Sequence, residues 1–172
     1  MMDLVQAARD GREDAFLQLF DDHHAGLFRF ACRLSGSVAD AEDLVQECFL
    51  ELLRPDCSYD PRRTPLRSYL FGVVRNQCIK RWRGNVKAAG PLTEPVDIAN
   101  PESQLLRGEV GEAVAHAVRQ LPDTQREILI LAHYEQMSLA EIAEVMELEV
   151  TAVKSRLQRA RAQLKERLAA YV

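Results

Sequence analysis

The sequence predicts an all-α protein made of two small helical domains joined by a flexible linker. Apolar residues recur at helical spacing over residues 4–82 and again over residues 105–168, and no segment shows the alternation expected of a strand. Between these stretches the helical spacing stops, and three prolines with two glycines interrupt the chain. We therefore expect domains at residues 1–83 and 104–172 and a linker at residues 84–103.

Turn and capping signals divide the first domain into helices. The apolar pattern breaks at residues 11–12 and ends at a Ser-Gly-Ser turn, so two or three helices are expected before that turn. A further helix should begin at Ser37 or Asp40, because acidic residues crowd the positions where the helix dipole favours them. Prolines in residues 59–65 predict a loop, and the pattern over residues 66–82 is helical again.

The second domain holds the most specific local pattern. Ser138, with Glu141 three residues later, predicts a capping box that opens a short helix. A break at residues 147–149 follows, and then a basic helix begins at about Thr151. A short capped helix, a three-residue break and a longer basic helix form a helix-turn-helix, in which the second helix enters the major groove of DNA.

The face of that basic helix suits contact with DNA. At about 100° per residue, its apolar residues form one stripe toward the core, and the opposite face holds small and amide side chains flanked by long cations. Such a face could read base edges between phosphate anchors, whereas the alternative is a solvated amphipathic helix with ordinary surface charges. The candidate DNA-contacting residues are Thr151, Lys154, Ser155, Gln158 and Arg159.

Charge is strongly segregated along the chain, although the net charge is only −4. Residues 3–51 carry 4 basic and 11 acidic side chains, and residues 54–83 carry 8 basic and 2 acidic ones. Residues 94–149 then carry 3 basic and 12 acidic side chains, and residues 150–172 carry 6 basic and 1 acidic one. Each half could therefore present a basic helix to phosphates while its acidic part faces water or a basic protein.

Several classes of function are disfavoured. No apolar run is long enough to span a bilayer and the N-terminus lacks signal-peptide features, so we expect a cytoplasmic protein without membrane insertion. Four cysteines lack metal-ligand spacing and are expected to be buried apolar side chains. The Asp21-Asp22-His23-His24 run is a poor metal or catalytic site, because consecutive helical residues diverge by about 100°. We expect no catalytic residue, metal, cofactor or small-molecule substrate.

Three stretches resemble extracytoplasmic-function (ECF, group 4) RNA polymerase sigma factors. The family's promoter-binding domain resembles LPDTQREILILAHYEQMSLAEIAEVMELEVTAVKSRLQRARAQL. Its polymerase-binding helices resemble AFLQLFDDHHAGLFRFACRLSGSVADAEDLVQECFLELL, and its helix for the minus-ten element resembles LRSYLFGVVRNQCIKRWR. The resemblance implies that residues 1–83 form sigma region 2 and residues 104–172 form sigma region 4. It also implies a sigma factor that binds core RNA polymerase and directs promoter recognition.

The resemblance implies a role for named residues in region 2. One set would dock the clamp coiled coil of the largest polymerase subunit: Asp43, Gln46, Glu47 and Leu50, helped by Asp40. Helical spacing agrees, because burying Leu44, Cys48 and Leu52 leaves most of this set exposed. A second set would contact the melted minus-ten strand: Asn76 at a base, with Arg75, Lys80, Arg81 and Arg83 at phosphates. Tyr69 and Phe71 could support an unstacked base or pack in the core.

In region 4, Lys154, Ser155, Gln158 and Arg159 match the family's readers of the minus-thirty-five element. The turn departs from the family, which has glycine, an apolar residue and proline where this chain has Glu147, Leu148 and Glu149. A left-handed backbone is therefore expected at a non-glycine residue, Glu147, and two carboxylates stand near the groove-binding helix.

The family further implies contact with the polymerase flap region, promoter DNA and an anti-sigma factor. The competing hypothesis is a stand-alone two-domain helix-turn-helix regulator that binds duplex DNA without polymerase. A sigma factor should bind a promoter well only within holoenzyme, so the two hypotheses differ in whether DNA binding needs core polymerase.

Overall fold

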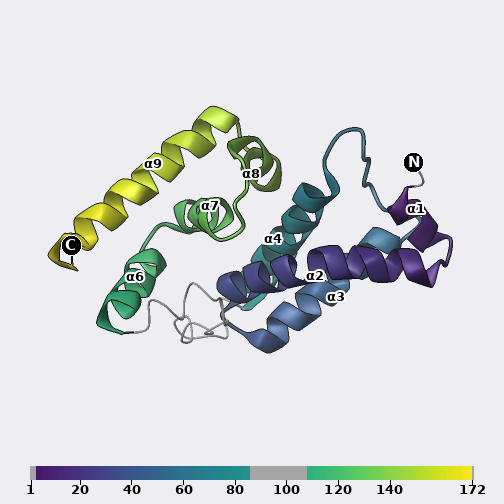
Figure 1. Ribbon diagram of the computed structural model, residues 1–172, viewed down its shortest axis with the longest axis horizontal. Coiled ribbons are helices and arrows are strands. Elements are labelled where there is room, and N and C mark those ends of the chain that lie inside the picture. The colour runs from purple at the N-terminus through teal and green to yellow at the C-terminus, as the bar shows by residue number, and fades with distance from the viewer. Residues whose placement is uncertain (1–2, 86–107, 172) are drawn as a thin grey trace. The chain divides into compact units, whose positions relative to one another are not determined.

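The computed structural model describes residues 3–85 and 108–171, and every regular element in these ranges is a helix (Figure 1). The chain separates into two compact units, Met1–Val96 and Asp97–Val172. Most of the predicted linker, residues 86–103, lies outside the described residues. The helix before it continues to Asn85, which is two residues beyond the predicted end of the first domain.

Four helices lie within residues 3–85 of the first unit, in agreement with the sequence pattern. Asp3 caps the first by accepting a hydrogen bond from the Val5 amide at 3.0 Å. Gly36 ends the second in the left-handed region, with φ of 70°, and Ser37 caps the third by accepting from the Asp40 amide at 3.2 Å. The helices are α1 (Leu4–Arg9), α2 (Glu13–Ser35), α3 (Val38–Leu53) and α4 (Leu66–Asn85).

Helix α2 forms the centre of this unit and packs against the other three helices. Phe30 of α2 and Phe71 of α4 are buried, with ring centroids 5.2 Å apart. The rings of Phe16 and Phe20 on α2 meet Phe49 of α3 at 6.2 and 5.3 Å. Because α3 and α4 each bury one face in this way, the opposite face of each helix points to solvent in a fixed orientation.

The second unit contains the predicted helix-turn-helix. Its elements are α6 (Glu109–Arg119), α7 (Asp123–His133), α8 (Leu139–Met146), α9 (Val150–Arg167) and the 3-10 turn η1 (Ala169–Tyr171). The capping box is confirmed: Glu141 accepts from the Ser138 amide at 2.7 Å, and the Ser138 hydroxyl accepts from the Glu141 amide at 3.2 Å. Pro122 is the residue just before α7.

The turn between α8 and α9 adopts the predicted left-handed conformation. Glu147 has φ of 54° and ψ of 45°, and the amide of Leu148 donates back to the carbonyl of Ala143 at 3.1 Å. This closes the end of α8 in a conformation that usually requires glycine. Gln136, in the loop before α8, also has a positive φ of 51°.

We predict that Glu147→Gly stabilises the second unit by about 1 kcal/mol, because glycine adopts a left-handed backbone without the penalty of a Cβ atom. Hydrogen exchange of α8 and α9 amides in the full chain would measure the change. Glu147→Gln removes only the charge and should change the free energy of unfolding of the second unit by less than about 0.5 kcal/mol. An equal gain from both variants would show that charge, not backbone conformation, limits stability at this turn.

Candidate nucleic-acid and polymerase interfaces

Helix α9 presents the predicted DNA-contacting face to solvent. Its Val153, Leu157 and Ala160 are buried against the rest of the unit. On the other side, Ser155 is half-exposed, and the remaining candidates are exposed: Thr151, Lys154, Gln158 and Arg159. The helix therefore has a short polar strip bordered by cations, in the arrangement that base readout between phosphate contacts requires.

A hollow of about 370 Å³ lies beside this face. Its lining combines apolar side chains with the polar side chains of Ser138, Lys154, Gln158 and Arg161. Sequence reasoning did not single out Arg161. The available signal was its spacing, because Arg161 follows Lys154 by seven residues and so lies on the same flank two turns later.

The N-terminus of α9 carries two carboxylates close to this basic surface. Glu147 and Glu149 are both exposed, and Glu149 precedes the helix without making a side-chain capping hydrogen bond. A duplex that lies against α9 brings phosphates near them, and charges within about 10 Å repel at 0.1 M salt. The turn therefore opposes some of the attraction that the cations of α9 supply.

Helix α3 presents an acidic face that also carries the exposed apolar side chain of Leu50. All five predicted polymerase-binding residues are exposed: Asp40, Asp43, Gln46, Glu47 and Leu50. Leu50 is 66% exposed, while Leu44, Cys48 and Leu52 of the same helix are buried. The predicted division of α3 into a buried and an exposed face is therefore confirmed.

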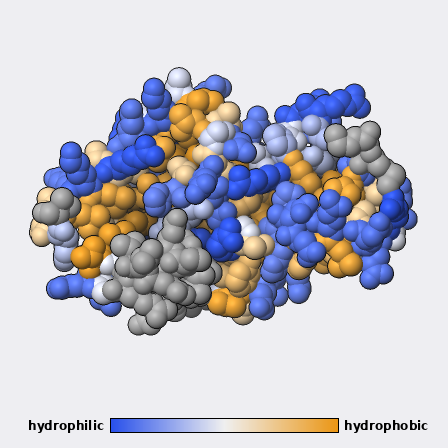
Figure 2. Space-filling view, in the orientation of Figure 1, coloured by the Kyte–Doolittle hydropathy of each residue, from blue (hydrophilic) through white to orange (hydrophobic). Residues whose placement is uncertain are grey.

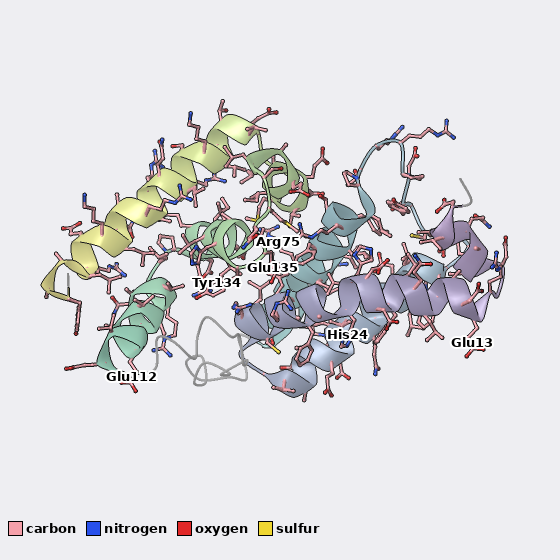
Figure 3. All side chains as sticks on the ribbon, viewed as in Figure 1. Glu13, His24, Arg75, Glu112, Tyr134 and Glu135 are labelled. Atoms are coloured by element: carbon pink, nitrogen blue, oxygen red, sulfur yellow. The ribbon has the colours of Figure 1, made fainter. Side chains whose placement is uncertain are left out.

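Helix α4 presents polar and basic side chains on its outer side, while Phe71 is buried in the unit. Asn76 and Lys80 are exposed, and Arg75 and Arg81 are half-exposed (Arg75 is labelled in Figure 3). Side chains beyond Arg81, including that of Arg83, lie outside the described residues.

The two aromatic candidates on α4 pack within the first unit. Phe71 is buried in the core. Tyr69 forms a hydrogen bond with the Cys57 thiol at 3.3 Å, and its ring centroid lies 5.0 Å from that of Tyr59. Burial, aided by that hydrogen bond, raises the pKa of Tyr69 above its ordinary value. Core packing thus accounts for Phe71 and largely for Tyr69.

Two contacts join the outer sides of α3 and α4, and the first of them pairs a predicted minus-ten residue with a predicted polymerase-binding residue. The Arg81 guanidinium donates to the Glu47 carboxylate at 2.5 Å. One helical turn away, the Gln77 amide donates to the Glu51 carboxylate at 2.9 Å. The exposed sides of α3 and α4 therefore form one continuous polar surface along their common edge.

The Asp21-Asp22-His23-His24 run forms part of the outer side of α2. His24, labelled in Figure 3, stacks between Phe20 and Phe28 at centroid distances of 4.4 and 5.9 Å. Partial burial lowers the pKa of His23. Within residues 3–85 and 108–171, no three histidine, cysteine, aspartate or glutamate side chains gather to hold a metal ion.

No helix in the same ranges is long and apolar enough to cross a membrane. Hydrophilic residues cover much of the face in Figure 2, with apolar areas between them.

Comparisons with known proteins match both units. The family described as Sigma-70 region 2 matches residues 19–88, and the family described as Sigma-70 region 4 matches residues 111–164. The ECF RNA polymerase sigma factor SigM of Mycobacterium tuberculosis is 33% identical over 165 residues, which cover 94% of this chain and 81% of SigM. The chain belongs to the ECF sigma factors. As such, it is an RNA polymerase sigma factor that directs promoter recognition, and a stand-alone regulator is not favoured.

Solved structures agree with this ECF sigma factor along most of the chain. CnrH, in complex with the cytosolic domain of CnrY, is 29% identical, with a TM-score of 0.70 and coverage of 97% of this chain and 96% of that one. The sigma factor RpoE of Bartonella quintana, in complex with the anti-sigma factor NepR, is also 29% identical, with a TM-score of 0.68 and coverage of 90% and 96%. Helices α3 and α4 lie in the region 2 match, and α7 and α8 lie in the region 4 match.

We predict that Lys154→Ala or Arg159→Ala weakens promoter binding by the holoenzyme. The binding free energy should fall by about 1–3 kcal/mol where the side chain contacts a base. Where it contacts a phosphate, the slope of log binding constant against log salt concentration should fall by about one. Promoter binding over a salt series would measure both quantities. Lys165→Ala is a control of equal charge near the far end of α9, because base contacts come from the N-terminal part of a recognition helix. Wild-type binding by the double variant of Lys154 and Arg159 would contradict the assignment.

Proposed function

We propose that this ECF sigma factor contacts core polymerase through α3, the melted minus-ten strand through α4 and the minus-thirty-five duplex through α9. The observation that carries the proposal is the exposed polar and basic face of α9 in a capped helix-turn-helix. A recognition helix of this kind needs only a few side chains at base edges, provided that cations anchor it to phosphates.

The proposed polymerase contact consists of Asp40, Asp43, Gln46, Glu47 and Leu50. Their common exposure supports the proposal, since the carboxylates can attract a basic partner and Leu50 can become buried on binding. We expect this face to meet the clamp coiled coil of the largest subunit, and region 4 to meet the flap region.

The proposed minus-ten contact centres on Asn76, whose exposed amide can hydrogen-bond a base edge that is hidden within a duplex. Arg75, Lys80 and Arg83 are the expected phosphate contacts of this site, together with Arg81. The ion pair between Arg81 and Glu47 gives Arg81 a second candidate role.

The proposed minus-thirty-five contact consists of Thr151, Lys154, Ser155, Gln158 and Arg159. We add Arg161, because it lines the same hollow as Lys154 and Gln158 and can reach the same DNA backbone.

The remaining proposals concern the class of the protein and its partners. We assign it to group 4 of the sigma factors, acting in the cytoplasm without catalysis of its own, with region 2 at residues 1–83 and region 4 at residues 104–172. An anti-sigma factor is proposed as a partner, by analogy with RpoE in its complex with NepR.

We predict that the free protein retains promoter DNA poorly and that adding core polymerase increases retention strongly. The reason is that α4 reads bases exposed only when the duplex is opened, and opening requires the holoenzyme. One comparison of promoter retention with and without core polymerase measures the effect. Equally tight, sequence-specific binding by the free chain would support a stand-alone regulator instead.

We also predict that Asn76→Ala leaves binding to core polymerase unchanged and weakens binding to a promoter fork with an unpaired minus-ten strand. Losing hydrogen bonds to one base should cost about 1–3 kcal/mol. The two affinities are measured separately, with fully paired DNA as the control ligand. Loss of polymerase binding would mean that α4 contacts polymerase rather than the melted strand.

A further inference from the structure

The two contacts between α3 and α4 have a regular geometry. Glu47 and Glu51 lie one turn apart on α3, and Arg81 and Gln77 lie one turn apart on α4. Arg81 binds Glu47 at 2.5 Å and Gln77 binds Glu51 at 2.9 Å, as expected of antiparallel helices in register. Two glutamate side chains of α3 are therefore held by donors from α4.

The ion pair lies at the surface, where it contributes little to stability. The Arg81 side chain is 32% exposed and that of Glu47 is 50% exposed. Pairs this exposed are screened by solvent and add little to the free energy of folding. Their chief physical effect is to restrict the rotamers of two long side chains.

We propose that Arg81 is a positioning residue for the polymerase-docking surface, holding the Glu47 carboxylate in its binding orientation before core polymerase arrives. This inference rests on the proposed function of α3. It gives Arg81 a role in core binding in addition to the phosphate contact proposed for it on α4.

The chemistry of the pair suits this role. A carboxylate has two oxygens and about four acceptor positions, and Arg81 contacts only Oε1 of Glu47. The second oxygen can therefore accept from a basic or amide donor of polymerase while Arg81 stays in place. A side chain already ordered loses less conformational entropy on binding, so preorganisation increases affinity without adding a contact to the partner.

The test compares Arg81 variants of the full chain in binding to core polymerase. Arg81→Ala should weaken core binding about three- to tenfold, the range expected for losing the preordering of one long side chain. Arg81→Lys should restore part of the loss. Glu47→Gln should weaken core binding as well, and the double variant Arg81→Ala with Glu47→Gln should be no weaker than the weaker single variant, because both changes disrupt one unit.

A matched control removes an arginine from another exposed ion pair of the same unit. Arg62 lies 3.9 Å from Asp60 in the loop before α4, and its side chain is 93% exposed. Arg62→Ala should leave core affinity unchanged, which excludes a general effect of net charge. Hydrogen exchange of α3 and α4 amides should match the wild type in all variants, and Arg81→Gln serves as a second variant if Arg81→Ala disturbs folding.

Three results would overturn the proposal, and they can be told apart. Unchanged core affinity in Arg81→Ala, with a lower salt slope for holoenzyme binding to the minus-ten fork, would make Arg81 a phosphate contact. Additive losses from Arg81→Ala and Glu47→Gln would show that the two residues act separately. Unchanged core affinity in both Glu47→Gln and Arg81→Ala would also refute the docking role proposed for Glu47.

Discussion

Burial of one apolar face orients each of the three helices that we propose as contact surfaces, α3, α4 and α9. In α9 the buried residues Val153, Leu157 and Ala160 determine which side chains point outward. In α3 and α4, packing against α2 through Phe49 and Phe71 has the same effect. Rotating any of these helices would expose buried apolar area, at a free-energy cost of roughly 25 cal/mol per Å². The core beneath the helices therefore fixes which side chains face outward.

Two unfavourable effects meet in the turn between α8 and α9: a strained backbone conformation and a concentration of negative charge. Glu147 adopts a left-handed backbone that glycine would adopt more easily, and its charge adds to that of Glu149 beside the DNA-binding face. The backbone penalty lowers the stability of the turn, whereas the two charges would oppose the proposed binding of DNA along α9. A sigma factor tolerates this because region 4 is one of several contacts, and linked contacts raise one another's effective concentration.

Charge segregation along the chain has a counterpart within the first unit. The acidic α3 and the basic α4 are neighbours, and their common edge carries the Arg81–Glu47 pair. A surface that is acidic on one side and basic on the other can meet a basic protein and a nucleic acid at the same time. The ion pair lies where these two sides meet.

The sequence by itself determined the elements and their outward faces: the capping box at Ser138, the turn at Glu147 and the exposed side of α3 could all be predicted. These features depend on helical periodicity and on hydrogen bonds between residues a few positions apart. Tertiary structure decided the burial of Phe71 and the place of Arg161 in the lining of the hollow. It also decided the pairing of Arg81 with Glu47, two residues that are 34 positions apart in the sequence. Contacts between distant residues depend on how helices pack, and no local spacing encodes that packing.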